Sequence, residues 1–368
     1  MKLALLYLNK YGGIANCTYE LAKTLSNNHD VTCYLSSENQ LLPLFETLPC
    51  KTRIFTWKRG QANLLRAMFS NKDTTGIARE ILEDKPDLVI DTGSWWWRGV
   101  VFTALQYKIP IAEIVHDPTP HPGPMYLFYQ LHYKLFPSKA DIVIALSDFC
   151  YKELVRKFPS KYHINSRHGI IIAAGNIDTD KIASMRNRML FFGRIEAYKG
   201  IDYLVDAFNI AKASLPEIEL TIAGEGKIAP KVLGKIKSSG IKLLHEYIPE
   251  SEIQQMIARH GVMILPYTYA TQSGVAAVAL ANGLPCIGTN VGALPEQIQD
   301  GRNGFIVPPK NSEELAKAMI KIAGSFDLAK QMAEESIRIG KEEYSWDKIG
   351  ECLMNDLETV LYKMKSRG

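Results

Sequence analysis

The sequence predicts an α/β protein made of two doubly wound domains. Short apolar runs alternate with longer segments of helical periodicity, and this pattern starts again after a polar stretch at residues 175–188. Continuous apolar runs are typical of strands buried on both faces of a parallel sheet, while the helical segments cover those faces. The chain of 368 residues exceeds the size at which one hydrophobic core usually stops growing.

Residues 1–174 are expected to form the first domain. Its predicted strands are Lys2–Leu8, Val31–Leu35, Asp87–Asp91, Ile109–Val115 and Asp141–Leu146. Its predicted helices include Ile14–Ser26 and Ile77–Glu83. Strands and helices in alternation predict a parallel sheet with helices on both faces.

Residues 175–188 are expected to be a linker, and residues 189–344 a second domain. Its predicted strands are Met189–Phe192, Glu219–Ala223, Ile241–His245, Val262–Leu265, Leu284–Gly288 and Phe305–Val307. Its predicted helices include Tyr203–Ala213, Glu250–Arg259 and Ser312–Ala323. Residues 345–368 carry apolar side chains at helical spacing, which predicts a closing helix that packs back on the first domain. Two such domains facing each other would line a central cleft with the carboxyl ends of their strands.

The composition narrows the class of protein. With 46% hydrophobic and 22% charged residues the chain is typical of globular proteins. A formal charge of +4 without a Lys/Arg block argues against a nucleic-acid partner. The six cysteines lack the short spacing of zinc or redox motifs, so we expect buried or free thiols and no structural disulfide.

No segment approaches the roughly 20 apolar residues that a spanning helix needs, and the apolar start is too short for a secretory signal. We therefore expect a cytoplasmic protein. Peripheral association with the inner face of the membrane stays open.

Three loops at predicted strand ends carry candidate phosphate-binding groups. Gly12 and Gly13 stand between a strand and a helix, where glycine permits positive φ and a helix N-terminus attracts anions; a simple tight turn is the alternative. Arg194 and Lys199 place two cations in one loop, which suits a diphosphate or merely forms a solvated basic loop.

The third loop opens a helix of small apolar residues. Its first turn presents unpaired N–H groups to which a phosphate could bind, whereas the later part of the helix is explained by burial alone. The residues concerned are Thr271, Gln272, Ser273, Gly274 and Val275.

Together these motifs resemble retaining glycosyltransferase family 4, also called group 1. The resemblance is carried by Gly193-Arg194, Lys199-Gly200, Ala223-Gly224-Glu225-Gly226, Leu265-Pro266-Tyr267, Gly283-Leu284-Pro285, Asn290–Glu296 and Asp300–Gly304, and more loosely by Gly12-Gly13 and His116. It implies the GT-B architecture, two Rossmann-like domains facing a central cleft. It also implies a metal-independent transfer with retention, with a nucleotide diphosphate sugar as co-substrate and no other cofactor.

The resemblance also implies roles. Arg194 and Lys199 would bind the donor diphosphate, and the amides of Ser273–Val275 would cap its distal phosphate. From the first domain, Gly12 and Gly13 would approach the diphosphate and His116 would lie beside the transferred sugar. A backbone group near Ile248 would meet the base.

The sequence departs from the family at two positions. The family usually carries two glutamates eight positions apart around the phosphate-binding turn, and here Ala270 and Val278 take their places. We expect Thr271, Gln272 and Ser273 to hold the sugar hydroxyls instead.

Aromatic residues suggest an acceptor site. Trp95 and Trp96, beside Trp97, follow a predicted strand and could stack on sugar rings, although at least one of the three must face the core. The aromatic segment 126–136 is either a buried helix or a surface for a bilayer or a lipid-linked acceptor.

The expected function is transfer of a sugar to a glycan or polyprenyl-linked acceptor in surface polysaccharide biosynthesis. One alternative is a GT-B nucleotide-sugar epimerase, which would be expected to keep acidic groups for proton transfer. The other is a catalytically silent subunit that binds a sugar nucleotide or a glycan, an alternative motivated by Ala270 and Val278.

Overall fold

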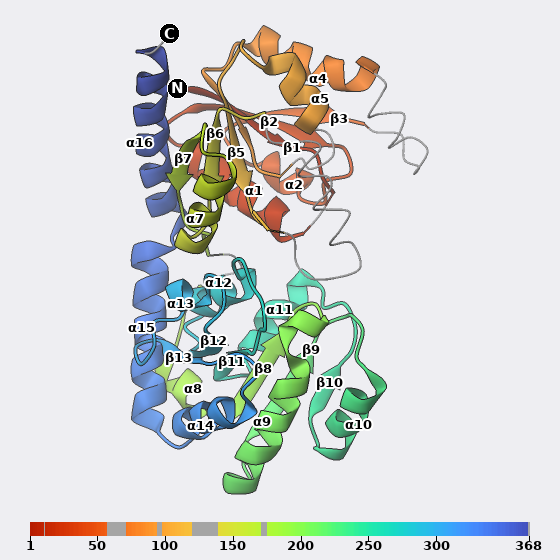
Figure 1. Cartoon of the computed structure of the whole chain (residues 1–368), viewed down its shortest axis with the longest axis vertical. Coiled ribbons are helices and arrows are strands. Elements are labelled where there is room, and N and C mark those ends of the chain that lie inside the picture. Colours follow the sequence, from red (N-terminus) through yellow and green to blue (C-terminus); the bar gives the residue numbers. More distant parts are fainter. Residues whose placement is uncertain (11, 57–70, 94–97, 120–138, 171–174, 367–368) are drawn as a thin grey trace. The chain divides into compact units, whose positions relative to one another are not determined.

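A computed structural model describes residues 1–10, 12–56, 71–93, 98–119, 139–170 and 175–366. The chain forms two α/β units (Figure 1). Unit 1 comprises Met1–Gly169 together with Trp346–Gly368, and unit 2 comprises Ile170–Ser345.

Unit 1 contains a sheet of seven parallel strands in the order β3-β2-β1-β4-β5-β6-β7. The strands are β1 (Lys2–Tyr7), β2 (Asp30–Ser36), β3 (Lys51–Phe55), β4 (Leu88–Asp91), β5 (Ile111–Val115), β6 (Ile142–Ala145) and β7 (Tyr162–Asn165). The described helices are α1 (Gly13–Leu25), α2 (Leu42–Phe45), α4 (Asn71–Asp84), α5 (Arg98–Leu105), α7 (Asp148–Lys157) and α16 (Trp346–Lys365).

Alternation along β1 builds the two cores of unit 1. Leu3, Leu5 and Tyr7 pack into a cluster with α1 and α16, whereas Ala4 and Leu6 pack into a second cluster with α4 and α5. Because successive strand residues point to opposite faces, an apolar run with no polar break is what a sheet covered on both sides requires.

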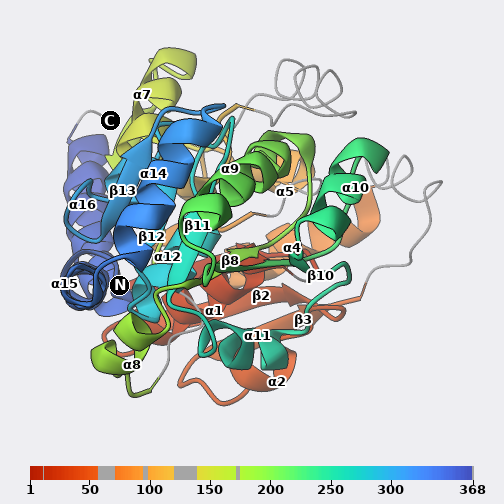
Figure 2. The same ribbon diagram turned by 90° about the horizontal axis from the view of Figure 1, so that it is seen from below.

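Unit 2 contains six parallel strands in the order β10-β9-β8-β11-β12-β13. The strands are β8 (Arg188–Phe192), β9 (Glu219–Ala223), β10 (Lys242–Leu244), β11 (Val262–Leu265), β12 (Cys286–Thr289) and β13 (Gly304–Val307). The helices are α8 (Thr179–Ser184), the 3-10 helix η1 (Ala197–Lys199), α9 (Ile201–Ser214), α10 (Pro230–Ser238), α11 (Glu250–Ile257), α12 (Gly274–Ala281), α13 (Leu294–Gln297), α14 (Ser312–Ala323) and α15 (Phe326–Glu343). On one face α9 contacts α10 and α14, and on the other α15 contacts α8 and α12 (Figure 2).

The boundaries of the units differ from the expected ones. The structure divides the chain after Gly169 rather than after residue 174, and the segment 175–188 is not a free linker. It contains α8, which Asp178 caps by accepting a hydrogen bond from the Lys181 N–H (3.1 Å). Ile182 and Ala183 of this helix are buried, and α8 packs on α15. The second boundary lies between Ser345 and Trp346, and α16 packs on α1 and β7 within unit 1.

Each sheet reverses its strand order at one point. In unit 1 the reversal lies between β1 and β4, and in unit 2 between β8 and β11. In open parallel sheets ligands bind beyond the carboxyl ends of the strands at such a point. A ligand-binding site is therefore expected at the loops after β1 and β4 in unit 1 and after β8 and β11 in unit 2.

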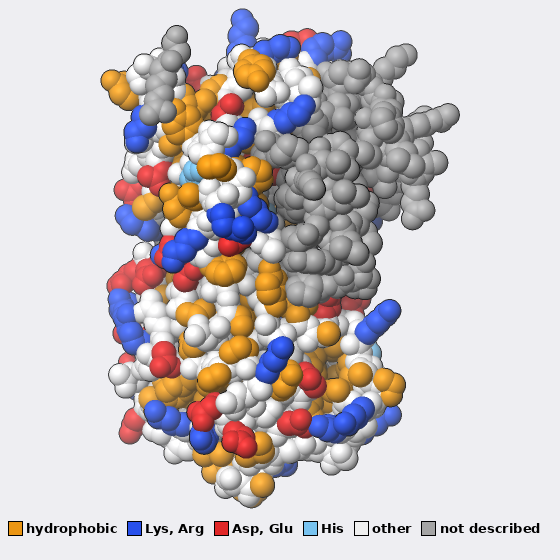
Figure 3. Space-filling view, in the orientation of Figure 1, with side chains coloured by type: hydrophobic (Ala, Val, Ile, Leu, Met, Phe, Trp, Pro, Cys, Tyr) orange, Lys and Arg blue, Asp and Glu red, His pale blue; other side chains and the backbone are white. Residues whose placement is uncertain are grey.

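On the face drawn in Figure 3, Lys and Arg side chains are interspersed with Asp and Glu. Within the described residues, no helix is both long enough and apolar enough to cross a membrane. All six cysteines are described, and none forms a disulfide.

Candidate functional site

Arg194 stands at the carboxyl end of β8 in unit 2. Gly193, directly before it, has φ of 125°, and the Gly193 N–H donates to the Ala223 carbonyl (3.0 Å). Arg194 is exposed, and its guanidinium contacts the Glu196 carboxylate (3.4 Å). A solvent-exposed pair of this kind contributes little, so the guanidinium can exchange its partner for an anionic ligand at small cost.

Lys199 ends the short helix that follows Arg194. Its Nζ lies 3.6 Å from the centre of the Tyr267 ring, and Tyr267 is fully buried after β11. Close packing of the two loops fixes this geometry: Gly200 has φ of 70°, and a Cβ there would lie 1.9 Å from the Pro266 carbonyl oxygen. The loop after β8 is thus held against the loop after β11.

The first turn of α12 lies beside the same loop. Ser273 caps the helix by accepting a hydrogen bond from the Ala276 N–H (3.2 Å), and its carbonyl accepts one from Gln297 Nε2 (3.0 Å). A Cβ on Gly193 would lie 3.5 Å from Val275 Cγ2, which places the turn next to the Arg194 loop. Because a helix N-terminus carries partial positive charge, this turn adds to the field of the two cations. The structure therefore brings Arg194, Lys199 and Ser273–Val275 together.

The two positions where the family carries glutamates lie in the core of unit 2. Ala270 and Val278 are 3% and 2% exposed. Of the three residues expected to replace the glutamates, Thr271 is fully buried and the Ser273 hydroxyl caps α12. Gln272 is half-buried, and its Oε1 makes no hydrogen bond among the described residues. Of the three residues, Gln272 is therefore the one whose side-chain oxygen could accept a hydrogen bond from a sugar hydroxyl.

Ile248 belongs to a different loop, the one after β10. Its side chain is buried, so only its backbone could meet a ligand. It follows the edge strand β10, which β9 separates from β8.

In unit 1, Gly12 and Gly13 lie at the exposed start of α1. Gly12 caps the helix with φ of 110°, a conformation that disfavours side chains. Among the described residues, a Cβ on Gly12 or Gly13 would meet nothing within 4 Å. In the part of the chain that the structure describes, both glycines at the N-terminus of α1 are exposed.

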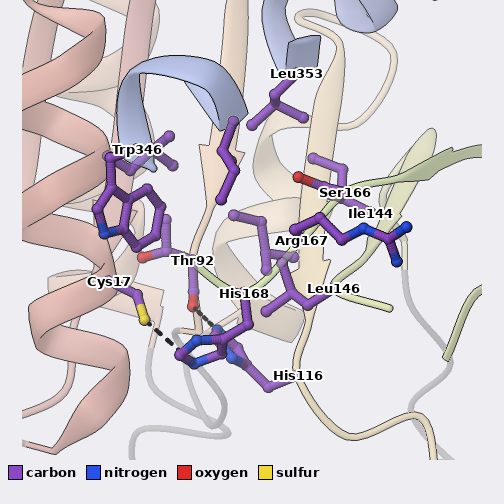
Figure 4. Close-up of a pocket in the computed structure, with 13 residues that line it drawn as sticks. Cys17, Thr92, His116, Ile144, Leu146, Ser166, Arg167, His168, Trp346 and Leu353 are labelled. Atoms are coloured by element: carbon purple, nitrogen blue, oxygen red, sulfur yellow. Dashed lines mark hydrogen bonds between the residues drawn. The ribbon is translucent and has the colours of Figure 1, made fainter. Parts of the chain in front are cut away.

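His116 follows β5 and is buried. Its Nε2 donates to the Thr92 carbonyl (3.0 Å), which leaves Nδ1 as an acceptor (Figure 4). Burial lowers the pKa of His116, although Asp117 opposes the shift. The imidazole is therefore neutral near pH 7.

His168 and Cys17 accompany His116, and the sequence analysis missed both. The two imidazole rings lie edge to face, 6.4 Å apart. His168 Nδ1 donates to the Gly169 carbonyl (3.1 Å), so its Nε2 accepts from the Cys17 thiol (3.5 Å). Burial lowers the pKa of His168 to about 4 and raises the pKa of Cys17 to about 12. No spacing in the sequence links these residues, because they come from α1 and from the segment after β7.

The three side chains line a cavity within unit 1. Its volume is about 20 Å³, enough for about one water molecule, and its other walls include Trp346 and Leu353 of α16. Figure 4 shows Cys17 and His168 on one side of it and the His116–Thr92 hydrogen bond beside them.

Some expected site residues cannot be placed. Trp95, Trp96 and the segment 126–136 lie outside the described residues. Among the residues that are described, no group of three or more His, Cys, Asp and Glu side chains could hold a metal ion.

Two family models match the two halves of the chain. Residues 11–165 match the model described as Glycosyltransferase Family 4, and residues 186–325 match that described as Glycosyl transferases group 1. Alpha-D-kanosaminyltransferase of Streptomyces kanamyceticus is 26% identical over 236 residues, which cover 58% of this chain and 59% of that relative.

Solved structures agree over nearly the whole chain. HepE of Anabaena, in complex with UDP and glucose, has a TM-score of 0.75 at 19% identity and covers 98% of this chain and 100% of its own. Sucrose-phosphate synthase of Thermosynechococcus elongatus has a TM-score of 0.73 at 17% identity and covers 99% of each chain. The chain therefore has the GT-B fold, and the two family models that match its two halves are both models of glycosyltransferases.

Proposed function

We propose that the protein transfers a hexose, with retention, from a nucleotide diphosphate sugar to a glycan or polyprenyl-linked acceptor. The proposed setting is surface polysaccharide biosynthesis in the cytoplasm, with peripheral association at the inner face of the membrane. The observation that carries the proposal is the meeting of Arg194, Lys199 and the first turn of α12 at the strand-order reversal of unit 2.

The donor diphosphate is the group that this arrangement suits. An exposed guanidinium can grip two phosphate oxygens, and an ammonium adds a compact charge. The Ser273–Val275 amides supply neutral donors with the same polarity. Together they would stabilise the negative charge that develops on the leaving diphosphate.

The proposed reaction needs no protein nucleophile. The bond between the anomeric carbon and the diphosphate oxygen breaks, and the acceptor oxygen bonds to the same face of the sugar. The acceptor proton passes to the departing phosphate oxygen. From unit 1, Gly12 and Gly13 would approach the diphosphate, and the neutral His116 would accept a hydrogen bond from the transferred sugar.

UDP is the nucleotide to test first. The similar HepE was solved with UDP and with UDP-glucose. We propose the same base, uracil, and the same sugar, glucose, for the donor of this chain.

The experiment is a thermal-shift titration with UDP, GDP, ADP and dTDP. We expect one nucleotide to stabilise the wild type and an Arg194→Ala/Lys199→Ala variant to bind it about 100-fold more weakly or worse, because charge-assisted hydrogen bonds contribute about 1.5–3 kcal/mol each. Lys231→Ala/Lys237→Ala is the matched control, since it removes two exposed charges from α10. If no nucleotide stabilises the wild type, or if both variants lose it equally, the donor site is wrong.

An assay of sugar transfer distinguishes a glycosyltransferase from a silent subunit that only binds the nucleotide sugar. The absence of carboxylates at Ala270 and Val278 makes the silent subunit the second candidate. The wild type incubated with the stabilising nucleotide's sugar conjugate and membrane extracts should release free nucleotide and label a glycan or lipid fraction. Binding without release under these conditions would leave the silent subunit as the better function.

A further inference from the structure

Two cysteine sulfurs of unit 1 are in contact. Cys33 lies within β2 and Cys50 directly precedes β3, and their Sγ atoms are 3.8 Å apart. Thr52 is the register partner of Cys33, and Cys50 lies two residues before Thr52. Because side chains alternate along a strand, both thiols are on the same face of the sheet.

We propose that Cys33 and Cys50 are a redox site that forms a reversible disulfide by exchange with a small disulfide such as oxidised glutathione. A disulfide requires an S–S distance of about 2.0 Å, so the sulfurs must approach by a little under 2 Å. Cys50 precedes the edge strand β3, whose residues are half-buried or exposed, so this end of the pair has room to move.

The exposure of the two thiols sets the order of events. Cys50 is half-buried and accessible, whereas Cys33 is fully buried. The contact with Cys33 lowers the pKa of Cys50, while the same contact and burial raise the pKa of Cys33. Cys50 is therefore the thiol that attacks first, because the thiolate is the nucleophile.

The exchange balances without any further reactant. The Cys50 thiolate attacks one sulfur of oxidised glutathione, forms a mixed disulfide and releases one glutathione thiolate, which takes up the proton that Cys50 lost. Cys33 then gives its proton to solvent, attacks Cys50 Sγ and expels the second glutathione, which is protonated in turn. The two cysteines are oxidised by two electrons, and one glutathione disulfide is reduced to two thiols.

Oxidation would fix both ends of the β2–β3 connection. Within this connection the Gln40 N–H donates to the Lys10 carbonyl (3.0 Å), and Lys10 lies two residues before Gly12. The disulfide would thus restrain a segment that contacts the loop leading into α1. A cross-link that closes a loop raises stability mainly by restricting the unfolded chain.

The test uses the full chain, purified reduced and then incubated with oxidised glutathione. Remaining thiols are alkylated in denaturant, and the digested protein is analysed by mass spectrometry. We expect a cross-linked peptide pair containing Cys33 and Cys50, lighter by about 2 Da than the two thiol peptides because two hydrogens are lost. Dithiothreitol should restore both thiols.

Two variants complete the design. Cys50→Ala should abolish the cross-link and leave Cys33 alkylated only in denaturant. Cys352→Ala removes the exposed thiol of α16 and should leave the cross-link unchanged. In the wild type, oxidation should raise the thermal midpoint reported by tryptophan fluorescence, and Cys50→Ala should show no such rise.

Two results would overturn the proposal. One is full alkylation of both Cys33 and Cys50 in the wild type after prolonged oxidation. The other is a glutathione adduct that stays on Cys50 without giving way to the cross-link. Both are read from the wild type alone, so they do not depend on how well a variant folds.

Discussion

The six strands of unit 2 follow the same order as the first six strands of unit 1, but the side chains at the carboxyl ends of the strands differ between the units. In unit 1 the edge buries two imidazoles, His116 and His168, whose lowered pKa values keep them neutral. In unit 2 the edge presents an exposed Arg194 and a half-buried Lys199 beside a helix N-terminus. The shared topology decides where loops gather, and the side chains decide which charge they offer.

The contrast fits a division of labour in the proposed reaction. Cations and helix amides suit a diphosphate, whereas a neutral imidazole with a free acceptor nitrogen suits a sugar hydroxyl. Variants and conditions that change one edge and leave the other unchanged test this difference between the two units. A convenient probe exists, because the sequence places all 5 tryptophans within the residues of unit 1.

The largest effect is expected from Gly200→Ala in unit 2. The new Cβ would collide with the Pro266 carbonyl at a positive φ, so we expect a loss of about 3 kcal/mol from strain and overpacking together. Denaturation followed by circular dichroism should show an early transition, while tryptophan fluorescence stays unchanged. Gly234→Ala is the control: its Cβ meets nothing within 4 Å in α10, so stability should rise slightly. Movement of the fluorescence transition with Gly200→Ala would mean that the units do not unfold separately.

A second, smaller effect is expected from pH and belongs to unit 1. The pKa of His168 falls from 6.5 in the unfolded chain to about 4 in the folded one, so the unfolded state binds the proton more tightly. The stability from neutral His168 is present above pH 6.5 and is lost progressively as pH falls toward 4. Between pH 7 and pH 5 this linkage amounts to about 2 kcal/mol.

Unfolding followed by tryptophan fluorescence at several pH values measures this loss. His168→Gln should flatten the dependence, although the variant starts from lower stability because it loses buried hydrogen bonds. His245→Gln, at an exposed histidine of unit 2, should leave the slope as it is in the wild type. Equal slopes in the wild type and His168→Gln would contradict a neutral buried imidazole.

The smallest effect is expected from Ser273→Ala. Loss of an N-cap hydroxyl costs about 1 kcal/mol of stability. Ser325→Ala removes the equivalent cap of α15 and should cost about the same. Isothermal titration with the stabilising nucleotide distinguishes them, since Ser273→Ala alone should also weaken binding. If Ser325→Ala weakens binding equally, the first turn of α12 has no special part in the site.

The sequence predicts the parts of the fold that depend on burial. Apolar runs such as Val262–Leu265 and Glu219–Ala223 mark strands that the structure also has, because a strand covered on both faces must be apolar throughout. The edge strands β3 and β7 escaped prediction, since most of their residues are exposed or half-buried and leave no such run. The helix α8 escaped it for a similar reason, because it is short and polar on most of its surface.

The candidate site can be proposed from the sequence where its residues stand together in one loop. Arg194 and Lys199 stand out within a few residues, and so does the turn that opens α12. Gln297 behind Ser273 and His168 beside His116 are brought in by tertiary packing from distant segments. No local pattern connects such residues, so a single sequence does not reveal them.

Unit 1 is made of two separate segments of the chain, and this affects the order in which the protein can fold during synthesis. Leu353, Leu357 and Leu361 of α16 complete the core on the α1 face of the sheet, yet the ribosome makes them after the whole of unit 2. Unit 2 is continuous and can fold as soon as it has emerged, whereas the core on the α1 face of unit 1 lacks the side chains of α16 until that helix has been made. During that interval the part of the core that α16 covers is exposed on the nascent chain, and chaperones that recognise hydrophobic surface can bind it.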